Sequence, residues 1–246
     1  MQNRYTGDIG DFGKFLLLKH LFPAKAITTV WYLYPDETHN NDGSHTVEEN
    51  NIPLYSHCYA IDSAMSELFH QIHRNPKRDV RRFEEVKILE NGSYFGEGIL
   101  GEGDRYRIQW LERAIHFVRE KQASVVCLDP DNGIKTGSMR RLSRSKQGKY
   151  ATLNEIENFF LIDSVQHLII YQHFNRLKKH TEQMEEKKAY FDKEYEGRAM
   201  VTILRHNPVQ ARFYIILSKK GLDENLLHSL EQIRYADKPF FTLLGN

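Results

Sequence analysis

Short apolar runs that resemble strands alternate with segments of helical periodicity along most of the 246 residues. The runs at 27–34, 123–128 and 167–171 are apolar and rich in β-branched residues, which is typical of strands buried on both faces. Leucines within 14–22, and apolar residues three or four apart over 108–118, predict helices. This alternation predicts an α/β fold in which helices cover both faces of a mainly parallel sheet.

The remaining elements follow from local pattern. Helices are expected at 60–73, 153–161 and 178–196, strands at 85–89, 199–204 and 212–217, and loops at 35–53 and 91–104. The last two strands are too close together for a helical crossover, so we expect them to pair as an antiparallel hairpin. Because no repeat or linker interrupts the chain, residues 1–246 are predicted to form a single domain.

Charge and cysteine content exclude several classes of protein. The 34 basic and 33 acidic residues leave a net charge of +1, which excludes a uniformly basic nucleic-acid coat but permits a local patch. Two cysteines cannot form a Cys-rich zinc site or a disulfide framework. No secretory signal or membrane-spanning run is evident, so we expect a cytoplasmic protein without a membrane contact. The oligomeric state cannot be inferred from the sequence.

Three acidic segments lie where a ligand would bind such a sheet. Ligands of open parallel sheets bind beyond the carboxyl ends of the strands. Residues 35–43 and 129–133 each follow a predicted strand, and residues 7–14 open the first helix. Asp8 and Asp11 could also serve simply as caps of that helix, and Lys14, taken alone, is typical of a surface lysine.

The segment Asp129-Pro130-Asp131-Asn132-Gly133 is the most informative of the three. Proline fixes the backbone directly after a strand-end carboxylate. The carboxylate and the proline carbonyl can then both accept hydrogen bonds from an exocyclic amine. The same five residues would also make an ordinary turn, so both interpretations stay open.

Two motifs resemble those of a known family. Asp129-Pro130 is similar to the start of the Asp-Pro-Pro-Tyr motif of amino-directed class I S-adenosylmethionine-dependent methyltransferases. The stretch Gly7-x-x-x-Asp11-x-x-Lys14 resembles the start of the bacterial large-subunit rRNA adenine-N6 methyltransferases, where it helps to build the active-site region. The resemblance implies a three-layer Rossmann-like methyltransferase fold, with a mainly parallel sheet ending in an antiparallel hairpin. It also implies methyl transfer to an exocyclic amine of a nucleic-acid base.

The resemblance assigns roles to ten residues. The catalytic candidates are Asp129, Pro130, Asp131, Asn132 and Lys14, and the S-adenosylmethionine-binding candidates are Asp11, Asp36, Glu37, Asp42 and Gly43. The chain departs from the family at two places. A segment with one glycine replaces the Gly-rich cofactor loop, and Asp131-Asn132 replaces a proline and a base-stacking aromatic residue.

A basic segment follows the Asp129 turn. It has no acidic residue and contains Lys135, Arg140, Arg141, Arg144, Lys146 and Lys149. Such a concentration predicts contacts with the phosphates of DNA or RNA and a strong dependence of binding on salt, although a solvated loop is the alternative. The basic run at 74–82 could extend the patch, and Tyr150 and Phe174 are candidates to stack on a displaced base.

Two other functions compete with methyl transfer. A metal-dependent nuclease would use residues at a regular spacing of three, together with Asp129 and Asp131 as oxygen ligands for a divalent metal. The regularly spaced residues are Asp36, His39, Asp42 and His45. Pro35-Asp36 with Glu85-x-Lys87 also forms a loose nuclease-like pattern. A catalytically silent protein that binds a nucleotide in the same cleft is the third possibility.

Overall fold

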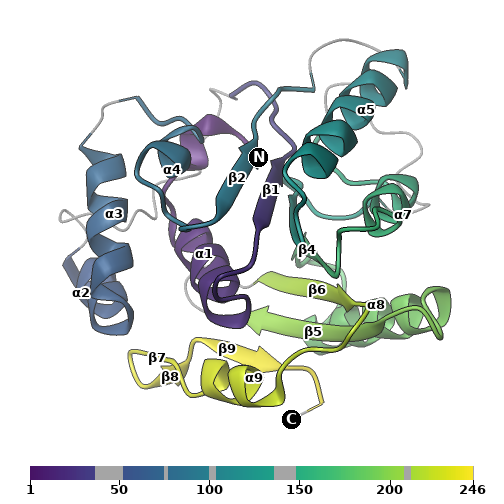
Figure 1. Ribbon diagram of the computed structural model, residues 1–246. Helices are drawn as coiled ribbons and strands as arrows, with labels where there is room; N and C mark the ends of the chain where they lie inside the picture. Colours follow the sequence, from purple (N-terminus) through teal and green to yellow (C-terminus); the bar gives the residue numbers. More distant parts are fainter. Residues whose placement is uncertain (37–51, 75–76, 100–103, 136–147, 208–211, 246) are drawn as a thin grey trace.

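A seven-stranded sheet organises the chain, with the strand order β2-β1-β3-β4-β6-β5-β9 (Figure 1). The computed structural model describes residues 1–36, 52–74, 77–99, 104–135, 148–207 and 212–245. Strands β1 to β4 are parallel to one another, whereas β6 is antiparallel to both β4 and β5. A parallel half joined to an antiparallel hairpin, with helices on both faces, confirms the predicted α/β fold class.

The elements have the following bounds. The strands are β1 Ile27–Trp31, β2 Gly92–Phe95, β3 Val125–Asp129, β4 His167–His173, β5 Met200–His206, β6 Arg212–Ser218 and β9 Phe241–Leu243, with a small separate hairpin of β7 Arg234–Tyr235 and β8 Lys238–Pro239. The helices are α1 Ile9–Leu21, α2 Ile52–Ile61, α3 Ser63–His73, α4 Arg82–Glu85, α5 Asp104–Glu120, α7 Leu153–Phe160, α8 His180–Glu194 and α9 Glu224–Glu231. A 3₁₀ turn at Asn3–Tyr5 precedes α1.

The helices divide between two faces of the sheet, each with its own apolar core. One core contains side chains of α1 to α4 and α9, and we call this side the α1 face. The other contains side chains of α5, α7 and α8, and we call it the α5 face. Figure 1 shows α1, α3 and α4 on one side of β1 and β2, and α5 and α7 on the other.

Strand alternation decides which residues face α1. In β3, Val125 and Cys127 belong to the core of the α1 face, whereas Val126 and Leu128 belong to the core of the α5 face. Because side chains alternate along a strand, Asp129 continues the first series and points toward α1. The Asp129 carboxylate is therefore directed by the same periodicity that builds the core.

Helix α1 begins earlier than its leucines suggest. The predicted helix at 14–22 is confirmed, but it starts at Ile9, after Asp8. The Asp8 side chain accepts a hydrogen bond from the Asp11 backbone N–H at 2.8 Å, so Asp8 is the N-cap. This extra turn brings Asp11 onto the same helix as Lys14.

The predictions between β1 and α5 needed three corrections. The strand expected at 85–89 is wrong, because α4 ends at Glu85 and the next strand, β2, lies in the segment expected to be a loop. Gly92 at its start and Gly96 directly after it hide the strand signal of β2. The helix expected at 60–73 is two helices, since Asp62 caps α3 by accepting from the Met65 N–H at 2.9 Å. Helix α2 also starts within the loop expected at 35–53.

The sheet extends beyond the predicted hairpin. Strands β5 and β6 pair as expected, but β9 adds antiparallel to β5, with Leu204 opposite Leu243. Helix α9 and the small β7–β8 hairpin precede β9 and were not predicted. None of the helices in the described ranges combines the length and apolar content that a membrane crossing needs.

Candidate functional site

Two carboxylates share one buried ammonium group at the carboxyl ends of strands β1, β3 and β4. Lys14 Nζ lies 2.8 Å from Asp11 Oδ1 and 3.0 Å from Asp129 Oδ1. The Lys14 and Asp11 side chains are each 3% exposed, and that of Asp129 is 5% exposed. Asp11 and Lys14 lie one turn apart on α1, and Asp129 is the last residue of β3. We call these three residues the α1 ion cluster.

Aromatic rings enclose the ammonium group. Lys14 Nζ lies 4.5 Å from the ring centroid of Trp31 and 6.0 Å from that of Tyr171. Trp31 is opposite Asp129 in the β1–β3 register, so both side chains point toward α1. Ring faces attract a desolvated cation, which fixes the position of the ammonium group further.

The two carboxylates of the cluster differ in how completely they are bonded. Asp11 uses both oxygens, since Oδ1 accepts from Lys14 and Oδ2 accepts from the Gly7 backbone N–H at 2.9 Å. Asp129 Oδ1 pairs with Lys14, and no described residue donates a hydrogen bond to Asp129 Oδ2. The cluster therefore presents one unused acceptor atom, and that atom belongs to Asp129.

Burial and charge shift the pKa of Asp11 and the pKa of Lys14. Desolvation raises the pKa of Asp11 to about 7, against the opposing effect of Lys14, and the charges of Asp8 and Asp129 raise it further. Burial alone would lower the pKa of Lys14, but Asp11 and Asp129 outweigh it and hold that pKa well above its ordinary value. Lys14 is thus a permanent cation, for which two acids compete.

A second buried cation, Arg212, lies beside the cluster. The centre of its guanidinium group is 5.5 Å from the Tyr171 ring centroid. A Cβ atom on Gly10 would come within 1.5 Å of Arg212 Nη1, so the arginine packs directly against the first turn of α1. The Tyr171 hydroxyl and His173 Nε2 are 2.7 Å apart, and burial lowers the pKa of His173 to about 3, which keeps it neutral.

The sequence did not single out Tyr171, His173 or Arg212 for this site. The sequence could have indicated them only by position. They lie near strand ends, at positions whose side chains point to the same face of the sheet as Asp129. Reading that signal requires the β4–β6 register, which places His173 opposite Arg212.

The residues after Asp129 are held in a tight turn. Pro130 is buried, and the Asn132 backbone N–H donates to the Lys149 carbonyl at 2.9 Å. Asp131 forms an ion pair with Lys149 at 3.6 Å. Gly133 has φ +91°, a conformation that favours glycine. The turn is thus both a structural turn and the support of Asp129.

Lys149 does not lie on an exposed basic patch. Only 7% of the residue is exposed, and its ammonium group interacts with Asp131 and with the Tyr34 ring, 5.5 Å from the centroid. Its charge is therefore used inside the protein rather than offered to phosphates. Lys135 is half-buried, and its backbone N–H donates to the Ala151 carbonyl at 2.8 Å.

Of the predicted cofactor residues after β1, the structure describes Asp36. It is exposed, and its Oδ1 accepts from the Arg4 backbone N–H at 3.2 Å. Met1 lies alongside the chain that leaves β1, since its carbonyl accepts from the Tyr34 N–H at 3.0 Å. Seven predicted site residues lie outside the described ranges: Glu37, Asp42, Gly43, Arg140, Arg141, Arg144 and Lys146.

The other candidate nucleic-acid contacts are partly engaged. Within the basic run at 74–82, Arg81 pairs with Asp79 at 2.5 Å. The Tyr150 carbonyl accepts a hydrogen bond from Arg107. Phe174 stacks on His180, with centroids 3.9 Å apart and ring planes at 12°, so one face of its ring is covered.

The described residues do not favour a metal centre. Among them, no group of three His, Cys, Asp or Glu side chains converges to hold an ion. His39, Asp42 and His45 lie outside the described ranges, while Asp129 and Asp131 each pair with a lysine. The nuclease-like Glu85-x-Lys87 does not lie on a strand: Glu85 ends α4 and Lys87 has φ +52°.

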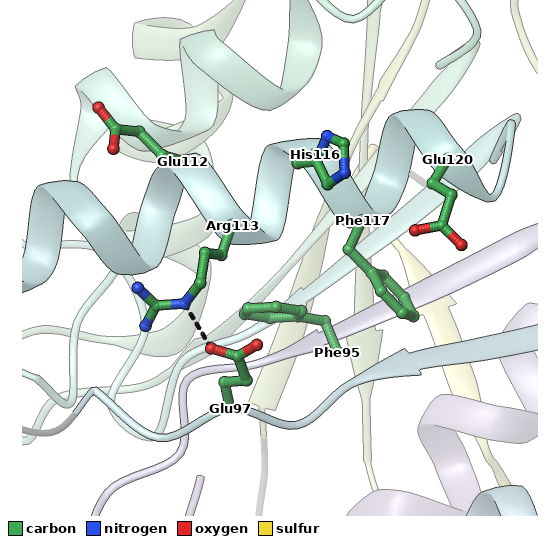
Figure 2. Close-up of a pocket in the computed structure, with 7 residues that line it drawn as sticks. All are labelled: Phe95, Glu97, Glu112, Arg113, His116, Phe117 and Glu120. Carbon is green, nitrogen blue, oxygen red and sulfur yellow. Dashed lines mark hydrogen bonds and ion pairs between the residues drawn. The ribbon is translucent and has the colours of Figure 1, made fainter.

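A cavity of about 410 Å³ opens on the α5 face, between β2 and α5 (Figure 2). Its lining consists of Phe95, Glu97, Glu112, Arg113, His116, Phe117 and Glu120. Glu97 pairs with Arg113 at 2.5 Å, and Figure 2 shows the carboxylates of Glu112 and Glu120 pointing in different directions. The charged side chains of this cavity do not converge on one point, whereas the carboxylates of the α1 ion cluster both contact Lys14.

No protein-family model matches the chain, and no characterised protein sequence or solved structure is significantly similar to it. Function must therefore be inferred from the geometry of the site.

Proposed function

We propose that this protein transfers a methyl group from S-adenosylmethionine to an exocyclic amine of a nucleic-acid base. The observation that carries the proposal is the 3.0 Å ion pair between Lys14 and Asp129. These residues belong to the two separate motifs that resemble class I methyltransferases, and they are far apart in the sequence. The strand pattern adds support, since Asp129 ends a central parallel strand of a sheet that continues into an antiparallel hairpin.

Asp129 and Pro130 would orient the reacting amine. The unused Oδ2 of Asp129 accepts one N–H of the amine, and the Pro130 carbonyl accepts the other, which directs the nitrogen lone pair toward the methyl donor. Lys14 acts through Asp129, because its ammonium group pairs with that carboxylate and fixes its position. Positioning of this kind, rather than proton abstraction, would supply most of the rate enhancement.

Among the proposed cofactor contacts after β1, Asp36 offers a hydrogen-bond acceptor to a bound cofactor. Asp36 is exposed at the exit of β1, and only its Oδ1 is bonded within the described ranges, so its Oδ2 can accept from a cofactor hydroxyl or amino group. Glu37, Asp42 and Gly43 remain proposed cofactor contacts, and Asp11 forms part of the adjoining wall. S-adenosylmethionine, when bound, would supply an electrophilic methyl group.

A nucleic-acid substrate is proposed from the basic segment that follows the Asp129 turn. Lys135, Arg140, Arg141, Arg144 and Lys146 remain its candidate phosphate contacts. Replacing Arg140, Arg141 and Arg144 should weaken binding to DNA or RNA and flatten its salt dependence, by about 0.9 in slope for each lost contact with duplex DNA.

Calorimetric titration and a matched pair of variants test the proposal. S-adenosylmethionine should bind the wild-type protein, and labelled methyl groups should appear in DNA or RNA. Asp129→Asn should lower the transfer rate by about 10²-fold, the cost that misplacing the reacting atoms by about 1 Å can have. Asp11→Asn removes the other carboxylate beside Lys14, yet should cost less than about tenfold because Asp11 has no unused oxygen.

Two results would overturn the proposal. One is the absence of binding heat with S-adenosylmethionine in the high micromolar range. The other is equal loss of transfer in the two variants, which would leave Asp129 without a special role. Divalent-dependent cleavage of nucleic acid, abolished by Asp129→Ala, would instead establish the nuclease.

A further inference from the structure

Leu177 is the most exposed large apolar side chain among the described residues. It is 90% exposed, whereas the next, Leu161, is 60% exposed. Leu177 lies in the loop after β4, the strand that pairs in parallel with β3, which ends at Asp129. A highly exposed leucine thus follows the carboxyl end of β4, the strand next to the one that ends at Asp129.

The loop that carries Leu177 is firmly built. Gln183 of α8 is buried and spans the loop: its Oε1 accepts from the Asn175 N–H at 2.9 Å, and its Nε2 donates to the carbonyls of Asn175 and Lys178 at 3.0 and 2.8 Å. The Asn175 side chain accepts from the Leu177 N–H at 2.9 Å. Side-chain hydrogen bonds therefore hold the backbone in the shape that projects Leu177 outward.

Cations flank the leucine on both sides. Arg176 and Lys179 are exposed, and their side chains form no hydrogen bond or ion pair with any described residue. Lys178 pairs with Glu186. No acid occurs from 174 to 181, so an apolar tip stands between two cations that can meet an anionic partner.

We propose that Leu177 is a wedge that enters the base stack of a double-stranded nucleic acid, while Arg176 and Lys179 bind the adjacent phosphates. The inference rests on the proposed function, because a base inside a duplex must leave the stack before its amine can reach Asp129. Apolar side chains inserted between base steps unstack and kink a duplex. Because β3 and β4 are adjacent parallel strands, a duplex bound over their carboxyl ends would meet both Asp129 and the loop that carries Leu177.

A fluorescent base analogue tests the wedge without any cofactor. The probes are a short DNA duplex and a short RNA duplex, each carrying 2-aminopurine, whose fluorescence rises when it unstacks. Saturating wild-type protein should raise the signal of at least one duplex, and the responding duplex identifies the partner. Leu177→Ala should lose most of the rise at equal saturation. Leu161→Ala should keep the fluorescence rise. Leu161 is the C-cap of α7 and precedes the start of β4, so it lies toward the opposite end of that strand from Leu177.

Two further variants test separately the loop that holds Leu177 and the two cations beside it. Gln183→Met keeps Leu177 but removes the three hydrogen bonds that hold its loop, so the fluorescence rise should fall. Arg176→Gln with Lys179→Gln should reduce the salt slope of DNA binding by roughly two, at about 0.9 for each phosphate contact, whereas Leu177→Ala should leave that slope unchanged.

The outcomes distinguish the wedge from the methyl transfer. No rise with wild-type protein on either duplex, or an equal rise with Leu177→Ala, overturns the wedge. An unchanged salt slope in the double variant overturns the phosphate contacts. A rise that depends on Leu177, in a protein that neither binds S-adenosylmethionine nor transfers methyl groups, supports the wedge and overturns the proposed function alone.

Discussion

Each face of the sheet buries an ion pair, and the two differ in how completely their carboxylates are bonded. On the α5 face, Glu155 Oε1 accepts from Arg107 Nε at 2.5 Å. Its Oε2 accepts from Arg107 Nη2 at 2.9 Å and from the Thr152 N–H at 2.8 Å. On the α1 face, Lys14 pairs with both Asp11 and Asp129, and Asp129 Oδ2 accepts no hydrogen bond from a described residue.

The difference is that the carboxylate on the α5 face is fully bonded within the protein, whereas the α1 ion cluster leaves one acceptor atom without a hydrogen bond. Glu155 belongs to the capping box of α7 and ties it to α5, and all its acceptors point at protein donors. Removing one partner of a buried pair is costly, whereas a fully bonded pair has nothing left to offer a ligand. The α1 ion cluster has fewer donors than acceptors, so a ligand can complete it.

The largest expected effect comes from removing the shared ammonium group. Lys14→Met keeps the length of the side chain but leaves two buried carboxylates without their cation, so the free energy of unfolding should fall by about 3–5 kcal/mol. Arg107→Met should cost less, because Glu155 keeps the Thr152 N–H and the Tyr32 hydroxyl. Urea unfolding of both variants measures the difference, and equal losses would contradict the comparison.

A pH dependence of stability should follow from Asp11. Folding raises the pKa of its carboxyl from 3.8 to about 7, so between these values the folded protein holds a proton that the unfolded chain releases. The free energy of unfolding should therefore fall as the pH rises from about 4 to about 7, by on the order of a few kcal/mol. Unfolding measured across this range checks the direction.

Two variants assign that pH dependence to one face. Asp11→Asn is neutral at every pH and should flatten the slope. The control on the α5 face, Glu155→Gln, should keep it, because the titrating group is still present. A slope that survives Asp11→Asn would show that another group is responsible.

A smaller effect is expected where α1 meets its second cation. In Gly10→Ala the new Cβ would lie 1.5 Å from Arg212 Nη1, so the buried guanidinium group must move. Overpacking of this kind should cost about 1–3 kcal/mol and outweigh the better helix propensity of alanine. Gly96→Ala is the control, since its Cβ would meet nothing closer than 3.8 Å. Thermal unfolding should separate the two, and similar melting temperatures would count against the close packing of Arg212.

The smallest effect is expected for an ion pair outside both cores. Arg113 and Glu97 line the cavity in Figure 2 with side chains 50% and 52% exposed. Arg113→Gln should change the free energy of unfolding by less than about 1 kcal/mol, because water screens exposed pairs. A loss as large as that of Arg107→Met would mean that burial is not what distinguishes these pairs.

Local pattern predicted most of the fold. Helices at 108–118 and 153–161 and strands at 27–34 and 123–128 are present because their periodicity and composition are properties of short segments. Strand β2 was missed because Gly92 within it and Gly96 directly after it reduce the strand signal of a four-residue segment. Strand β9 was missed because an edge strand of three residues carries almost no pattern of its own.

The site was predictable in its parts but not in its connections. The residues by themselves singled out Asp129 as a strand-end carboxylate and the 7–14 segment as an acidic helix start, while Lys14, taken alone, was typical of a surface lysine. Tertiary structure decided that Lys14 is buried between Asp11 and Asp129, and that Lys149 forms an ion pair with Asp131. Periodicity is local, so one sequence reveals it. The burial of a charge and the choice of its partner depend on which elements pack together, and only the folded chain fixes that.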